Sequence, residues 1–136
     1  LLQADGVHVG QSDCSIQQAR AILGKSACIG VSAHNLEEAR MAQQGGADYI
    51  GCGAVFGSAT KQDATPLSRE TLRTICQGVS IPVVAIGGIT AQNVQQLAGS
   101  GIQGIAVVSA IFGQPDKTEA ARQMHQHANQ VCGGAQ

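Results

Sequence analysis

The chain has 136 residues, of which 43% are hydrophobic and 12% are charged, and its formal net charge is −1. These values fit one globular domain with a sizeable core, and they exclude a strongly basic nucleic-acid-binding protein. No stretch reaches the roughly 18 apolar residues of a membrane span. From the charge and from this absence we expect neither a nucleic acid nor a membrane as a partner.

Five short apolar runs predict the strands of a parallel sheet. Each run is rich in β-branched residues and bounded by glycine, which is typical of strands that are buried on both faces. In chain order the runs cover residues 6–9, 28–32, 49–53, 83–86 and 105–109.

The stretches between these runs begin with residues that cap helices. Ser15, Asn35 and Asp116 each stand three positions before a Glu or Gln, as in a capping box. Ser68 and Thr90 are candidate caps for two more helices. The predicted order is therefore strand then helix, five times over.

Self-similarity favours one repeated βα unit over two domains. The segments 3–10, 46–53 and 101–108 each place a turn residue before an apolar strand. Repeated βα units build either an open doubly wound sheet or a closed eight-stranded barrel. In "GVHVG" the alternation places Val7 and Val9 on one side and His8 on the other, as in a barrel strand whose branched residues face the helices. The G-x-G-x-x-G fingerprint of dinucleotide-binding proteins is absent.

The five cysteines contain no C-x-x-C pair. Cys28 and Cys52 lie in apolar runs, so we expect them to be buried, reduced thiols, as in a cytoplasmic protein.

Polar residues follow the first two predicted strands, where both architectures bind ligands. Asp13 can hold a divalent cation or cap the next helix. Ser32 can donate to a ligand or begin a turn. His34 can act as a general acid or lie in a surface turn.

The later strands end in glycines and hydroxyls, which suit a phosphate group. Residues 51–64, "GCGAVFGSATKQDA", place two hydroxyls and Lys61 in a glycine-rich loop, where Lys61 is either an anion ligand or a solvated side chain. Residues 85–90, "AIGGIT", and 107–113, "VVSAIFG", end the last two strands. Glycines permit close backbone approach, and free N–H groups there can bind phosphate.

Five segments together resemble thiamine phosphate synthase. They are "ADGVHVGQSD", "GVSAHNLEEA", "GADYIGCGAVFGSATKQDA", "IPVVAIGGIT" and "GIAVVSAIFG", in this order and at these spacings. The resemblance implies a TIM (βα)8 barrel, of which residues 1–136 hold about the last five units as a single thiamine phosphate synthase or TenI-like domain. It also implies a transferase that joins hydroxymethylpyrimidine diphosphate to hydroxyethylthiazole phosphate and releases diphosphate.

The resemblance also implies roles for individual residues. Asp13 matches a magnesium ligand, and Ser32 and Lys61 match the residues that hold the pyrimidine diphosphate and act in catalysis. The thiazole phosphate site is matched by Ser58, Ala59, Thr60, Gly88, Val108 and Ser109. The family usually has threonine in place of Ser58 and often proline in place of Gly57. Ser58 keeps the hydroxyl of the threonine, and Gly57 keeps the turn of the proline. The substrates are phosphorylated small molecules, and a homo-oligomer is compatible with the sequence.

The chain departs from the family pattern in one large respect. The family's Gln-x-Arg-x-Lys segment and Asn-Asp pair, which belong to its first three units, have no counterpart here. We therefore expect an N-terminally incomplete domain, and we expect these 136 residues alone to be inactive. Two alternatives stay open: a thiazole tautomerase of the same barrel superfamily, and a non-catalytic phosphate-binding regulatory domain.

Overall fold

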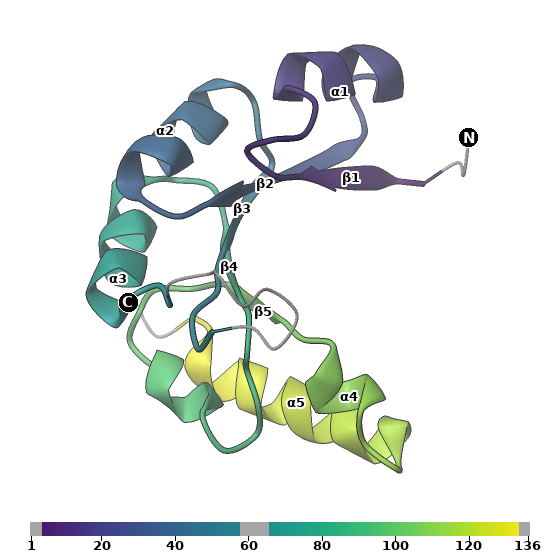
Figure 1. Cartoon of the computed structure of the whole chain (residues 1–136), viewed down its shortest axis with the longest axis vertical. Helices are drawn as coiled ribbons and strands as arrows, with labels where there is room; N and C mark the ends of the chain where they lie inside the picture. Colours follow the sequence, from purple (N-terminus) through teal and green to yellow (C-terminus); the bar gives the residue numbers. More distant parts are fainter. Residues whose placement is uncertain (1–3, 58–65, 134–136) are drawn as a thin grey trace.

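The computed structural model describes residues 4–57 and 66–133, which form one curved parallel sheet with helices along its convex side (Figure 1). Within these residues the sheet has five strands, and their spatial order is their chain order. They are β1 (Gly6–Val9), β2 (Cys28–Ala33), β3 (Tyr49–Cys52), β4 (Val83–Ile86) and β5 (Gly104–Ala106). All five predicted strands are confirmed, with ends that differ by no more than a few residues.

A helical segment follows each strand, as the predicted repeat requires. The segments are α1 (Ile16–Leu23), α2 (Leu36–Gln44), α3 (Arg69–Gly78), the 3-10 helix η1 (Val94–Leu97), α4 (Ser109–Phe112) and α5 (Lys117–Val131). The longest of them, α5, has 15 residues. No helix in the described part of the chain has the length and apolar character needed to cross a bilayer.

Four of the five predicted helix caps are confirmed. In each case the backbone N–H of the third helical residue donates to the capping side chain, which satisfies one of the donors that a helix start leaves unpaired. The donor and acceptor pairs are Gln18 and Ser15, Glu38 and Asn35, Thr71 and Ser68, and Glu119 and Asp116. Ser15 and Gln18 form a complete capping box.

The fifth predicted cap, Thr90, is wrong. No α-helix follows Thr90, and the chain instead forms the short 3-10 helix η1. The side chain of Asn93 accepts from the Thr90 N–H at 2.8 Å and donates to the Gly88 carbonyl at 2.8 Å. Asn93 therefore holds the loop in a turn, and Thr90 does not start a helix.

The two faces of the sheet differ in composition, as the "GVHVG" alternation predicted. Branched and other apolar residues on the helix-covered face are buried, among them Val9, Ile29, Val31, Ile50, Cys52, Val83 and Ala85. The strand register places His8, Gly30, Ser32, Tyr49 and Gly51 on the opposite face. The concave face thus carries the glycines and polar groups, which is where a barrel places its interior.

The prediction for the cysteines is half correct. All five are free thiols, and Cys52 is buried among the helices, where desolvation raises its pKa to about 12. Cys28 is exposed. Its register partner is Gly6, so its side chain lies on the glycine-rich face away from the helices.

The starts of the alternate strands β2 and β4 are held by the same pair of bonds. Asp48, just before β3, accepts from the Ile29 N–H at 2.7 Å and donates its own N–H to the Ile29 carbonyl at 2.8 Å. Gln103, just before β5, makes the same two bonds with Val83, at 2.7 and 2.9 Å. The similarity between segments 46–53 and 101–108 therefore has a physical basis. In each case the strand before the segment needs partners for a backbone N–H and a backbone carbonyl near its start, and Asp48 or Gln103 supplies both.

We expect the Asp48 bond to make stability depend on pH. The Ile29 N–H and then Arg20, at 2.9 Å, hold the pKa of the Asp48 carboxyl below its usual range. A carboxyl with a lowered folded pKa stabilises the protein above its ordinary pKa of about 4 and loses this effect as the pH falls. Because Asp48 is half-exposed, Asp48→Asn should cost about 1 kcal/mol or less at pH 7.

Denaturant unfolding between pH 3 and 7 measures this difference. Gln103→Ala is the matched control, because it removes an equivalent but uncharged bond and its cost should not change with pH. A cost of Asp48→Asn that stayed constant from pH 7 to pH 3 would contradict the argument.

Candidate active site

Residues from four strand ends meet at one edge of the sheet, because parallel strands all end on the same side. The turn of residues 10–13 follows β1, and Ser32 lies near the end of β2. Residues 53–57 follow β3, and Gly87 and Gly88 follow β4. This edge carries Asp13, Ser32 and Gly88 of the predicted site, whereas Val108 and Ser109 follow β5.

Ser32 is the most firmly held of the predicted site residues. Its Oγ lies 2.9 Å from Nε2 of His8, and the other ring nitrogen of His8, Nδ1, lies 2.9 Å from the hydroxyl of Tyr49. The side chain of Gln11 donates to the Ser32 carbonyl at 2.6 Å. Three neighbouring strands thus fix the position of one hydroxyl.

Two glycines leave the space that the His8 and Tyr49 rings occupy. A Cβ at Gly51 would lie 2.7 Å from Cε1 of His8, and one at Gly30 would lie 2.0 Å from the Tyr49 ring. Burial lowers the pKa of His8, although the charge of Asp13 opposes the change. Burial also raises the pKa of Tyr49, with a further contribution from Cys28. Both shifts favour the uncharged forms of the His8 ring and the Tyr49 phenol.

Asp13 lies in a tight turn at the end of β1. Its Oδ2 accepts from the Gly10 N–H at 2.7 Å, and its own N–H donates to the Gly10 carbonyl at 3.2 Å. Ser15, not Asp13, caps α1, so the interpretation of Asp13 as the helix cap is wrong. Asp13 also lines a cavity of about 310 Å³ between this turn and α2. The carboxylate remains exposed and able to bind a further group.

His34 is a surface residue that pairs within its own turn. Its ring Nδ1 lies 3.0 Å from Oε2 of Glu38, which also accepts from the His34 N–H at 2.8 Å. Burial by itself would raise the pKa of Glu38, but the hydrogen bonds from His34 lower it. The His34 ring and the Glu38 carboxylate are therefore paired with each other at the start of α2. This pairing agrees with the interpretation of His34 as a surface-turn residue.

The loop that contains Gly88 packs directly on the segment after β3. The N–H groups of Val55 and Phe56 donate to the carbonyls of Ile86 and Gly87, at 3.0 and 3.1 Å. A Cβ at Gly88 would lie 2.8 Å from the carbonyl oxygens of Phe56 and Gly57. These glycines are needed for the contact between two loops, whether or not a phosphate lies beside them.

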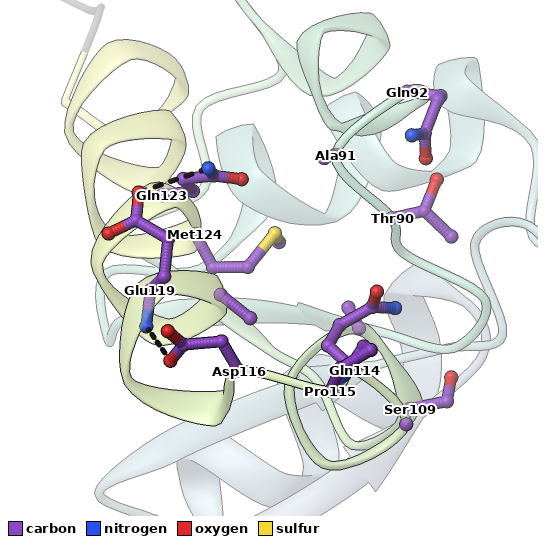
Figure 2. A pocket seen from close by; sticks show the side chains of 13 residues that line it. Thr90, Ala91, Gln92, Ser109, Gln114, Pro115, Asp116, Glu119, Gln123 and Met124 are labelled. Atoms are coloured by element: carbon purple, nitrogen blue, oxygen red, sulfur yellow. Dashed lines mark hydrogen bonds between the residues drawn. The ribbon is translucent and has the colours of Figure 1, made fainter.

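Val108 and Ser109 lie at the start of the short helix α4, and both are exposed. Ser109 lines a cavity of about 640 Å³ that extends to Thr90 and to α5 (Figure 2). Asp116 and Glu119 form one wall of this cavity, and neither Gly88 nor Val108 lines it. Because two carboxylates repel an anion, we do not assign this cavity to the predicted phosphate site.

Four predicted site residues, Ser58, Ala59, Thr60 and Lys61, lie outside the described residues. Among the residues that the structure describes, no three His, Cys, Asp or Glu side chains are grouped as a metal site. Sequence reasoning did not single out His8, Tyr49 or Gln11 as site residues. The polar position of His8 in an alternating strand was a signal for His8, whereas Tyr49 and Gln11 gave no such signal.

Comparison with known proteins identifies the family. A model of the family described as thiamine monophosphate synthase matches residues 1–111. The chain belongs to this family. The thiamine-phosphate synthase of Ruminiclostridium cellulolyticum is 54% identical over 121 residues, which are 89% of this chain and 58% of that protein. That of Methanobrevibacter smithii is 53% identical, over 82% of this chain and 53% of that protein.

A solved structure of a family member has the same fold. Thiamine phosphate pyrophosphorylase from Pyrococcus furiosus matches with a TM-score of 0.87 and 41% identity, over 97% of this chain and 63% of that one. A 3-hexulose-6-phosphate synthase matches with a TM-score of 0.67 at 17% identity, which concerns the fold alone. The predicted TIM-barrel architecture is confirmed as five consecutive βα units within the described residues. The chain spans little more than half the length of the curated relatives that it matches.

Proposed function

We propose that this family member acts as a thiamine-phosphate synthase, a transferase that joins hydroxymethylpyrimidine diphosphate to hydroxyethylthiazole phosphate and releases diphosphate. The observation that carries the proposal is the 54% identity to a protein of that name over 89% of this chain. The alternatives, a thiazole tautomerase and a regulatory domain, find no such support. We also infer that residues 1–136 belong to one barrel domain, because the described strands are adjacent in a single sheet.

The roles that we propose divide the site residues between the two substrates. Ser32, Lys61 and Asp13 act on the pyrimidine diphosphate. The thiazole phosphate is bound by Ser58, Ala59, Thr60, Gly88, Val108 and Ser109. The position of the Ser32 hydroxyl supports the role that we propose for Ser32. The residue is held by hydrogen bonds at the carboxyl edge of the sheet, beside the turn that contains Asp13.

The chemistry of the reaction requires groups that stabilise negative charge. We propose that the diphosphate leaves first and that the thiazole nitrogen then captures the resulting pyrimidinylmethyl cation. Fixed donors aimed at the leaving group lower this barrier, since charge grows there in the transition state. The nitrogen already has a lone pair, so no general base is needed. Holding the thiazole by its phosphate places that nitrogen in line with the reacting carbon.

The residues present fit a magnesium ion as cofactor. Magnesium is usually bound through one or two carboxylates, with water and substrate phosphates as the other ligands. Asp13 offers one exposed carboxylate, and its Oδ2 is oriented by the Gly10 N–H. When bound, the ion would neutralise charge on the departing diphosphate.

An assay of thiamine phosphate formation from the two substrates tests the proposal. It should be run on the chain itself and on a chimaera in which the remaining residues of the Ruminiclostridium cellulolyticum relative are joined to it. We expect product and diphosphate in equal amounts from the chimaera, and much less product after Ser32→Ala. A folded chimaera that isomerises the thiazole but forms no thiamine phosphate would contradict the proposal and favour the tautomerase.

The role of Asp13 leads to a separate prediction. Asp13→Asn should raise the magnesium concentration needed for half-maximal activity about tenfold or more, because an amide is a weaker ligand for a hard cation. The melting temperature should stay nearly unchanged, since Ser15 caps α1. Titrating activity against magnesium measures the effect. A lowered melting temperature with unchanged magnesium dependence would show that Asp13 is structural.

A further inference from the structure

The concave face of the sheet carries a chain of three hydrogen-bonded side chains, Tyr49, His8 and Ser32. They come from the adjacent strands β3, β1 and β2, and both ring nitrogens of His8 have a partner at 2.9 Å. The His8 and Tyr49 rings are also packed together, with centroids 5.4 Å apart. In this geometry the His8 ring has a hydrogen-bond partner at both of its nitrogens.

The chemistry of the three groups decides which way the hydrogen bonds point. A neutral imidazole has one N–H donor and one acceptor nitrogen, so one neighbour of His8 must donate to it and the other must accept. The phenol of Tyr49 is a stronger acid than the hydroxyl of Ser32, and it donates more readily to an imidazole nitrogen. On this acidity argument Tyr49 would donate to Nδ1, which would place the proton of His8 on Nε2, facing Ser32; each ring nitrogen lies 2.9 Å from its partner.

This direction has a consequence for Ser32. With the His8 proton on Nε2, the Ser32 oxygen, 2.9 Å away, would accept, and the proton of Ser32 would not be used in that bond. The Ser32 carbonyl is held at the same time by Gln11, at 2.6 Å, which fixes the backbone from which the hydroxyl projects. A hydroxyl whose oxygen already accepts a hydrogen bond can donate its own proton to a ligand.

We propose that His8 and Tyr49 are positioning residues that make Ser32 a hydrogen-bond donor to a phosphoryl oxygen of the substrate. The inference rests on the proposed function, in which Ser32 binds the pyrimidine diphosphate. With the opposite direction, Ser32 would present lone pairs to an anion, which would repel it.

Nitrogen-15 NMR of the imidazoles in the 136-residue chain tests the direction without any ligand. The chain has four histidines, and His8→Phe assigns the His8 signals. At pH 8 we expect His8 to be in the Nε2–H form. Tyr49→Phe should shift its two nitrogen signals toward the average of the two neutral forms, because the donor to Nδ1 is lost. A His8 ring in the Nδ1–H form would overturn the inference.

Calorimetric titration of the chimaera described above with inorganic diphosphate tests the consequence. We expect Tyr49→Phe and His8→Phe each to weaken binding about three- to tenfold, the usual effect of losing one net hydrogen bond. Neither change should weaken it further in a Ser32→Ala background, because both act through Ser32. The control His125→Asn, on an exposed position of α5, should leave binding unchanged.

Two results would overturn the inference at this stage. Losses that add to that of Ser32→Ala would show that His8 and Tyr49 act independently of Ser32. If the chimaera did not bind diphosphate, the proposed role of Ser32 would fail together with the donor role inferred from it. The NMR result distinguishes these failures, because it reports the direction of the hydrogen bonds whatever binds.

Discussion

Lys61→Ala is expected to slow the chemical step of thiamine phosphate formation about 100- to 1000-fold, the usual cost of losing one preorganised electrostatic donor. In the proposed mechanism the ammonium stabilises negative charge on the departing diphosphate, and this charge is largest in the transition state. Single-turnover kinetics of the active chimaera measure the step directly. A variant with an unchanged chemical rate would contradict the catalytic role proposed for Lys61.

Thr60→Ala is the matched comparison at the neighbouring position. Its hydroxyl is assigned to the phosphate of the other substrate, so its loss should mainly raise the thiazole phosphate concentration needed for half-saturation. A buried partner left without its hydrogen bond costs about 1 to 3 kcal/mol, or roughly 5- to 150-fold. Equal effects of the two variants on the chemical rate would contradict the assignment of different substrates to Lys61 and Thr60.

Of the stability changes that we predict, Gly87→Ala is expected to be the largest, with a loss of about 2 to 5 kcal/mol in the free energy of unfolding. Gly87 has a φ of 101°, which L-residues rarely adopt, and a Cβ there would lie 2.6 Å from the Cα and Cβ of Ala54. Backbone strain of about 1–2 kcal/mol and overpacking of about 1–3 kcal/mol therefore add together. The loss should appear as a lower denaturant midpoint.

Gly46→Ala separates the two contributions. Gly46 has a similar φ of 91°, but a Cβ there would meet nothing within 4 Å. Its cost should therefore be the strain alone, about 1–2 kcal/mol. Equal losses at the two glycines would show that the contact between Gly87 and Ala54 contributes nothing.

The sequence by itself determined the elements and their order. Runs such as 83–86 form strands because apolar, β-branched residues stand together between turn residues. Caps such as Ser15 with Gln18 could be predicted because the two partners are three residues apart and meet in any helix that starts there. The family followed from motifs at the strand ends, since ligand-binding residues keep their local spacing. Asp13 and Ser32 were predicted as site residues for the same reason.

Only the tertiary structure decided which side chains meet. His8 and Tyr49 are 41 residues apart, and they touch because the strand register places both on the concave face where Gly30 and Gly51 leave room. The same register turns Cys28 away from the helices, although its apolar neighbours suggested burial. In each case the deciding contact depends on how neighbouring strands or loops align, and local residue patterns do not contain that alignment.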